Sequence, residues 1–150
     1  MDLAEQAVVV TGAGSGMGKA TACRLARRNA LVAALDIAAK PVLALTQELG
    51  GLGIECDVGS ESSVRTAIQR VVAELGPPRV LVNCAGIAAA QRISGRKGPH
   101  DLGLFQKVIR TNLVGTFNMM RLVAEEMKQL DPVGESGARG VMINTASVAA

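Results

Sequence analysis

Short runs made only of apolar residues alternate along this chain with longer amphipathic stretches. A strand that is apolar on both faces suits a parallel sheet that is covered by helices on both sides. Strands that alternate with helices indicate βαβ units with right-handed crossovers. We therefore predict an α/β fold built on a doubly wound parallel sheet. The strands we expect are Ala7–Val10, Leu31–Leu35, Val80–Val82, Val141–Ile143 and, on a weaker pattern, Ile54–Val58.

The amphipathic stretches between these runs are typical of helices. One of them has Pro41 in its first turn and Gly50 after its last residue. Another has Ser60 placed as an N-cap and stops at Gly76-Pro77-Pro78. The expected helices are residues 17–29, 41–49 and 64–75, and a long one with a stripe of side chains on one face, namely Phe105, Ile109, Asn112, Thr116, Met120, Val123 and Met127.

Two stretches have neither pattern and are expected to be loops. Residues 86–100 form the longer one, which carries the basic residues Arg92, Arg96 and Lys97. A loop of this length is usually functional or mobile, and a solvated surface insertion is the alternative. Residues 131–140 form the second flexible stretch.

Composition excludes several classes of protein. The 150 residues are 49% hydrophobic and 19% charged, a balance that fits one folded domain and excludes disorder. No apolar run approaches the length of a membrane span, and the N-terminus lacks a signal-peptide pattern, so neither a membrane nor secretion is expected. Only two aromatic residues and a net charge of +3 argue against nucleic acid as a partner. The three cysteines have no metal-binding spacing, which favours free thiols in a reducing compartment and no metal. We expect a cytoplasmic location, or the mitochondrial matrix in a eukaryote.

A glycine-rich turn connects the first strand to the first helix. Its glycines stand at positions 12, 14, 16 and 18. Glycine permits the tight turn and lets backbone N–H groups approach a pyrophosphate, and the N-terminus of the helix favours that anion. The pattern predicts a Rossmann-type dinucleotide site, with a purely structural turn as the alternative. It is not a P-loop, because position 20 is Ala.

Two aspartates follow the second and third strands. Asp36 stands 18 residues after Gly18, where a carboxylate can accept hydrogen bonds from an adenosine ribose. It would repel a 2′-phosphate, so NAD is favoured over NADP, although Lys40 weakens this inference. An N-cap for the next helix is the alternative for Asp36. Asp57 ends the third strand and could meet the adenine amine, with a structural role as the alternative.

These residues, together with Asn83-Cys-Ala-Gly86 and Asn144-Thr-Ala-Ser147, resemble the short-chain dehydrogenase/reductase family. Thr11–Gly18 matches the TGxxxGxG pattern of that family, and all its motifs occur in family order along the whole chain. The resemblance implies NAD as cofactor, with Ser15 and Met17 on its pyrophosphate side. The cofactor-binding set is then Gly12, Ser15, Gly16, Met17, Gly18, Asp36, Asp57, Val58, Asn83, Cys84, Ala85 and Gly86.

The resemblance also implies individual roles within and beyond this set. Asp57 acts with Val58 on the adenine, whereas Cys84, Ala85 and Gly86 run along the ribose. The side chain of Asn83 is expected to tie the central strands together. Ser147 matches the catalytic serine that hydrogen-bonds the reacting hydroxyl or carbonyl. Asn112 matches the catalytic asparagine that holds a water near a lysine, and a structural network is the alternative.

Further runs refine the resemblance within the family. They are similar to members that act on 3-hydroxyacyl-CoA thioesters, as is the long insertion after Gly86. That implies transfer of hydride between nicotinamide and a secondary alcohol or ketone, with hydroxysteroids as the next candidate substrates, and a homotetramer. The runs are Val82–Ile87, Asn112–Asn118, Arg121–Ala124 and Ile143–Ala150.

The proton-transfer residues of the family are missing. They are a Tyr and, four positions later, a Lys, about a dozen or more residues beyond the serine, but these 150 residues contain no Tyr. We therefore expect residues 1–150 to be the NAD-binding N-terminal portion of a longer single-domain enzyme, inactive alone and with a sheet incomplete at its C-terminal side. A non-catalytic dinucleotide-binding scaffold is the alternative if the natural chain has 150 residues. An NADP-linked ketoreductase is a weaker option that Asp36 disfavours.

Overall fold

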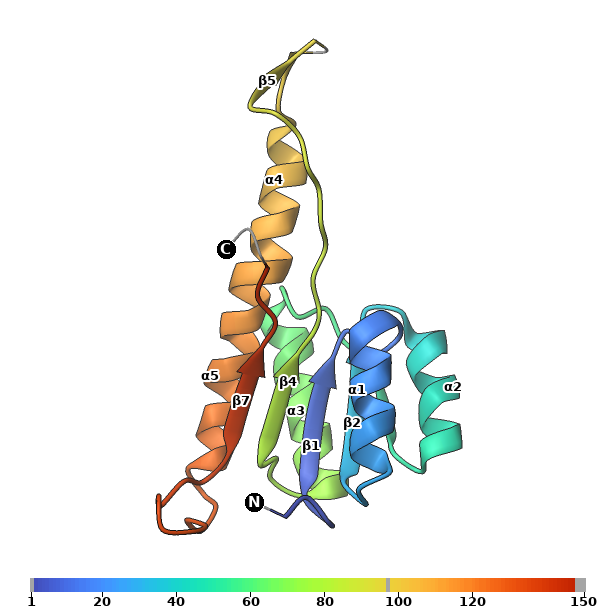
Figure 1. Cartoon of the computed structure of the whole chain (residues 1–150), viewed down its shortest axis with the longest axis vertical. Helices are drawn as coiled ribbons and strands as arrows, with labels where there is room; N and C mark the ends of the chain where they lie inside the picture. The colour runs from blue at the N-terminus through green and yellow to red at the C-terminus, as the bar shows by residue number, and fades with distance from the viewer. Residues whose placement is uncertain (1, 97, 148–150) are drawn as a thin grey trace.

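The computed structural model describes residues 2–96 and 98–147. Its main feature is a five-stranded sheet with the strand order β3-β2-β1-β4-β7, in which all neighbouring strands are parallel (Figure 1). The predicted α/β fold with a doubly wound parallel sheet is therefore confirmed. The strands are β1 (Ala7–Thr11), β2 (Leu31–Asp36), β3 (Leu52–Glu55), β4 (Val80–Asn83) and β7 (Val141–Asn144).

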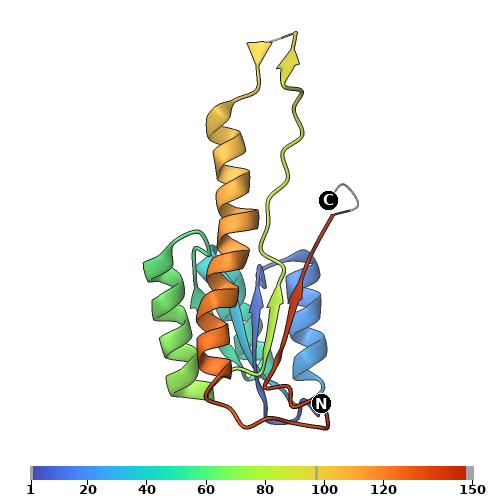
Figure 2. The same ribbon diagram turned by 90° about the vertical axis from the view of Figure 1, so that its left-hand side faces the viewer.

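Helices cover both faces of this sheet (Figure 2). The helices α1 (Gly16–Ala26) and α2 (Ala39–Leu49) lie on one face, and α3 (Glu61–Leu75) and α5 (Thr116–Met127) on the other. Strand β1 is wholly buried, and its side chains alternate between the two cores. Val8 and Val10 pack with Val42 on one side, whereas Val9 packs with Val71 and Val123 on the other. Burial on both faces is what selects an all-apolar strand.

The ends of three helices follow the signals in the sequence, with small differences. Ser60 caps α3 by accepting a hydrogen bond from the Ser63 N–H at 3.4 Å. Gly50 ends α2 with a left-handed φ of 70°, but this helix begins at Ala39, two residues before the predicted start. Helix α1 ends at Ala26 instead of residue 29, because the chain turns back there and Asn29 takes a φ of 59°.

The third strand differs most from its prediction. It was expected at 54–58 and lies at Leu52–Glu55, paired with β2 from Ala33 onward. The left-handed Gly50 reverses the chain immediately after α2, so the strand starts two residues earlier. Gly53 weakens the strand pattern in the sequence, yet α2 requires it. A Cβ at that position would come 2.7 Å from Thr46 Oγ1 and 2.8 Å from the Val42 carbonyl oxygen.

The long helix predicted around residues 105–127 is present but is not uniform. It consists of α4 (Leu102–Ile109), a π-helical segment η1 (Arg110–Gly115) and α5. The predicted stripe is buried at one end only: Val123 and Met127 are buried, whereas Phe105 is 52% exposed. The wider turn of a π-helix shifts the facing of side chains on its two sides. In addition, α4 extends past the end of the sheet (Figure 1).

The two predicted loops contain only short regular elements. At the far end of the first, β5 (Ser94–Gly95) and β6 (Gly98–Pro99) form a small antiparallel pair, and Lys97 lies outside the described residues. In the second loop, a single bridge joins Val133 and Ala138. Strand β7 forms one edge of the sheet, with Ile143 52% exposed. Among the residues that the structure describes, no helix is both long and apolar enough to span a bilayer.

Replacing Gly53 with Ala should destabilise the complete protein by about 1–3 kcal/mol, because the added methyl group overpacks the contact between α2 and β3. Gly95→Ala is the matched control, since the nearest atom to its Cβ would be 4.0 Å away. The thermal unfolding midpoints of both variants measure the difference. Equal midpoints would show that α2 and β3 do not require glycine at position 53.

Candidate dinucleotide site

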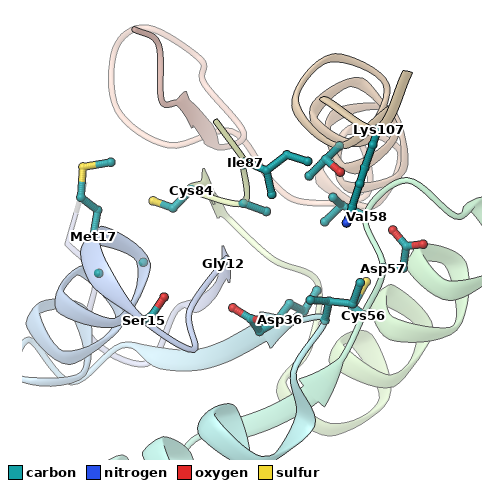
Figure 3. Close-up of a pocket in the computed structure, with 17 residues that line it drawn as sticks. Gly12, Ser15, Met17, Asp36, Cys56, Asp57, Val58, Cys84, Ile87 and Lys107 are labelled. Carbon is teal, nitrogen blue, oxygen red and sulfur yellow. The ribbon is translucent and has the colours of Figure 1, made fainter. Parts of the chain in front are cut away.

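A pocket of about 390 Å³ lies where the carboxyl ends of β1, β2, β3 and β4 meet helix α4 (Figure 3). In the strand order, β2 and β4 flank β1, so the connections diverge at this edge. Ligands of open α/β sheets bind at such switch points. Eleven of the twelve residues that the sequence assigns to a cofactor line the pocket: Gly12, Ser15, Gly16, Met17, Gly18, Asp36, Asp57, Val58, Cys84, Ala85 and Gly86.

The glycine turn forms one wall of the pocket by close backbone packing. Gly12 has a φ of 65°, and a Cβ there would lie 2.8 Å from the Ala85 backbone nitrogen. A Cβ at Gly18 would collide with the Gly12 backbone, so both positions require glycine. Gly16 opens α1 with a φ of 51° and has no atom within 4 Å of the place of its Cβ. Backbone N–H groups at a helix start that borders open space fit the phosphates of a dinucleotide.

Asp36 is held against the glycine turn by backbone hydrogen bonds. Its Oδ2 accepts from the Gly14 N–H at 2.9 Å, and its Oδ1 accepts from the Ala38 N–H at 3.0 Å. The N-cap of α2 is Ala38, so Asp36 does not have the capping role that was its alternative. The carboxylate therefore lies beside the turn, on the pocket wall, where it can accept hydrogen bonds from ribose hydroxyls.

Asp57 lies in the turn after β3 and is held from two sides. Its Oδ1 accepts from the Gly59 N–H at 2.9 Å, and its Oδ2 pairs with Arg110 Nη2 at 2.9 Å. Arg110 was not predicted from the sequence, nor were Lys107 and Thr111, which line the same pocket from the helix. Helical spacing could have placed these three side chains near one another, but not opposite Asp57.

Val58 is fixed by the helical segment that packs behind it. A Cβ at Gly115 would come 2.6 Å from Val58 Cγ2, so this glycine lets the helix approach. Asn118 is buried and donates from Nδ2 to the Val58 carbonyl oxygen at 3.0 Å. Its Oδ1 accepts from Arg121, which also pairs with Glu61. Hydrogen bonds from Arg65 and Arg121 lower the pKa of the Glu61 carboxyl.

Asn83 is the one assigned residue that does not line the pocket. It is buried, and its Nδ2 donates to Asn144 Oδ1 at 2.9 Å, which joins β4 to β7. The Thr11 hydroxyl donates to Asn83 Oδ1 at 3.4 Å and accepts from the Cys84 and Ala85 N–H groups, both at 3.1 Å. This network links three strands, as expected for the Asn83 side chain, and Thr11 is its centre.

Asn112 lies within η1 and makes a paired contact with the start of the long loop. Its Oδ1 accepts from the Ile87 N–H and its Nδ2 donates to the Ile87 carbonyl oxygen, each at 2.9 Å. The side chain is exposed, so burial does not explain its bonding. The structural network that was its alternative is thus present, whereas the role in holding a water stays a prediction.

The two cysteines on the pocket wall differ in environment. Burial raises the pKa of the Cys56 thiol to about 11, so this group stays neutral near pH 7. Cys84 is half-buried, with Thr145 Oγ1 3.7 Å from its Sγ. Within the described ranges, no three His, Cys, Asp or Glu side chains are grouped as metal ligands.

Ser147 lies three residues beyond the end of β7 and is exposed. It is not among the residues that line the pocket. His100, which precedes the N-cap of α4, is half-buried: its Nδ1 lies 2.7 Å from the Asp101 carbonyl oxygen, and its ring meets that of Phe105 edge-on with centroids 6.3 Å apart.

Comparison with known proteins assigns a class to this fold and site. The sequence profile of the short chain dehydrogenase family matches residues 6–150, so the chain belongs to that family. It is 46% identical over 146 residues to human 3-hydroxyacyl-CoA dehydrogenase type-2, which covers 95% of this chain and 56% of the human protein. It is 38% identical to D-threitol dehydrogenase from Mycolicibacterium smegmatis, over 95% of this chain and 52% of that protein.

A solved structure agrees with these sequence relationships. The crystal structure of 3-hydroxyacyl-CoA dehydrogenase type-2 from Mycobacterium avium superposes with a TM-score of 0.89 at 39% identity, over 99% of this chain and 60% of that one. The chain thus spans between half and two thirds of the length of these relatives. The family resemblance inferred from the motifs is confirmed.

Proposed function

We propose that the complete protein is an NAD-dependent oxidoreductase that moves hydride between nicotinamide and a secondary alcohol or ketone. One observation carries the proposal: the glycine turn and the fixed carboxylates of Asp36 and Asp57 line a single pocket at the switch point of the sheet. NAD, when bound, supplies the hydride acceptor that such a reaction requires.

Each part of the pocket has a task in this proposal. The N–H groups at the start of α1 bind the pyrophosphate, and Asp36 accepts from the adenosine ribose. Asp57 and Val58 bind the adenine, and Cys84, Ala85 and Gly86 line the ribose. Ser147 orients the reacting hydroxyl or carbonyl of the substrate. Asn112 holds a water molecule in addition to its contact with Ile87.

We propose 3-hydroxyacyl-CoA thioesters as the substrates, because the relatives reported above at 46% and 39% identity carry that activity in their names. Hydroxysteroids and other secondary alcohols are the second candidates, and the likeness to a D-threitol dehydrogenase supports testing polyols. A non-catalytic dinucleotide-binding scaffold is the alternative if the natural chain has 150 residues. A Tyr-x-x-x-Lys motif in the complete gene product would exclude that candidate.

We further propose that the complete protein is a homotetramer, located in the cytoplasm or, in a eukaryote, in the mitochondrial matrix. The exposed apolar side chains along α4, η1 and α5 suit contact with a second copy of the chain. The molar mass in solution tests this assembly. The side chains are Leu102, Phe105, Leu113, Val114 and Phe117.

NAD should bind more tightly than NADP, because the Asp36 carboxylate would face the 2′-phosphate of NADP. Asp36→Asn keeps an acceptor for the Gly14 N–H but removes the charge, so the preference should fall by about tenfold or more. Titrations of both nucleotides measure the ratio of dissociation constants, with the exposed Glu48→Gln as the control. Tighter binding of NADP by the unmodified protein would contradict the assignment.

Ser147→Ala should lower kcat with 3-hydroxyacyl-CoA roughly 100-fold and leave the affinity for NAD unchanged, since the hydroxyl acts on the substrate. Ser147→Thr keeps a hydroxyl and should restore part of the rate, and the exposed Ser136→Ala is the control. Steady-state kinetics and NAD titration provide the two measurements. Loss of NAD binding with normal turnover would exclude the proposed role.

A further inference from the structure

Arg110 connects the helical segment η1 to the turn that follows β3. Its Nη2 lies 2.9 Å from Asp57 Oδ2, and its Nε donates to the Gly59 carbonyl oxygen at 3.3 Å. A Cβ at Gly59 would come 2.8 Å from Arg110 Nε, so glycine at this position allows the guanidinium to lie against the backbone. The turn and the arginine therefore fit each other closely.

The contacts of Asp57 fix the direction of its carboxylate. The Gly59 N–H binds Oδ1, and Arg110 binds Oδ2. A carboxylate has about four acceptor positions, so each oxygen can still accept another hydrogen bond. The Asp57 side chain is 38% exposed, so the protein interior alone does not hold it. A planar guanidinium that also binds the Gly59 carbonyl restricts rotation of the carboxylate better than a single backbone N–H.

The support beneath Arg110 is also fixed. The helix that carries it is attached to the same turn by Gly115, which packs against Val58, and by the hydrogen bond from Asn118 to the Val58 carbonyl. Three successive residues of the turn, Asp57, Val58 and Gly59, thus contact the continuous helix formed by η1 and α5. Movement of the Arg110 backbone relative to Asp57 is limited by these contacts.

We propose that Arg110 is a positioning residue that aims the Asp57 carboxylate at the exocyclic amine of the base, and so makes the pocket select adenine over hypoxanthine. This inference rests on the proposed binding of NAD. An ionised carboxylate is acceptor-only, so it binds the amino group of adenine and repels the carbonyl oxygen that replaces it in hypoxanthine. Selection requires a fixed carboxylate, because one free to rotate would turn toward solvent.

Lys107 is the rival determinant of base selection. It stands three residues before Arg110, lines the pocket and points into it (Figure 3). As a donor, an ammonium group would favour the carbonyl of hypoxanthine over the amine of adenine. Replacing Arg110 should therefore lower the preference for adenine, whereas replacing Lys107 should not lower it.

The experiment compares NAD with nicotinamide hypoxanthine dinucleotide in equilibrium titrations of the complete protein. The unmodified protein should bind NAD about tenfold more tightly, the effect of one hydrogen bond to a charged acceptor. Arg110→Ala should reduce this ratio to about threefold or less, and Arg110→Lys should not restore it, because lysine lacks the planar fork. Arg70→Ala removes an exposed ion pair of similar length, 2.7 Å, away from the pocket, and should leave the ratio unchanged.

A double-mutant cycle separates positioning from general stability. In an Asp57→Ala background, Arg110→Ala should have no further effect on the ratio, whereas a purely structural role would act in both backgrounds. An unchanged ratio in Arg110→Ala, or a fall in the ratio on Lys107→Ala, would overturn the inference while leaving NAD binding intact. Failure of the unmodified protein to bind NAD at all would overturn the proposed function together with the inference.

Discussion

The candidate site depends on one close approach of backbone to backbone, where Gly12 at the end of β1 packs against Ala85 at the end of β4. Any side chain at position 12 would push these two strands apart. The Thr11 hydroxyl stabilises the same junction by accepting hydrogen bonds from the N–H groups of Cys84 and Ala85. With the β1 and β4 ends held together in this way, the glycine turn lines the pocket. The start of α1 then borders the space in which a phosphate can be bound.

The acidic groups of the pocket are held by different means. The Asp36 carboxylate is held by two backbone N–H groups, one in the glycine turn and one at the start of α2. Asp57 depends on a helix that is more than fifty residues away in sequence. The π-helical segment η1 contributes Arg110 to Asp57 and Asn112 to Ile87, so a single turn of helix contacts both the turn after β3 and the start of the long loop. π-helical turns are frequent at functional sites, where they redirect side chains.

Much of this arrangement could be predicted from the sequence because it follows local rules. Apolar runs indicate the strands, and Ser60 and Gly50 mark helix ends through capping and left-handed geometry. The contribution of the long helix could not be predicted in the same way. A regular helical period placed Asn112 on one face of a continuous helix, but nothing in a linear pattern indicates the π-helical turn in which it lies. The contacts of Arg110 and Asn118 with residues 57–59 depend on tertiary packing, which sequence spacing does not encode. The third strand was misplaced because Gly53, required by contact with α2, obscured its pattern.

A crystal structure of the complete protein with NAD bound tests the central claim most directly. The account predicts that the pyrophosphate lies at the N–H groups of residues 16–18, with the adenosine ribose on Asp36 and the adenine amine on Asp57. Electron density for the nucleotide elsewhere, or the adenosine half lying away from Asp36 and Asp57, would contradict the claim that this pocket is a dinucleotide site.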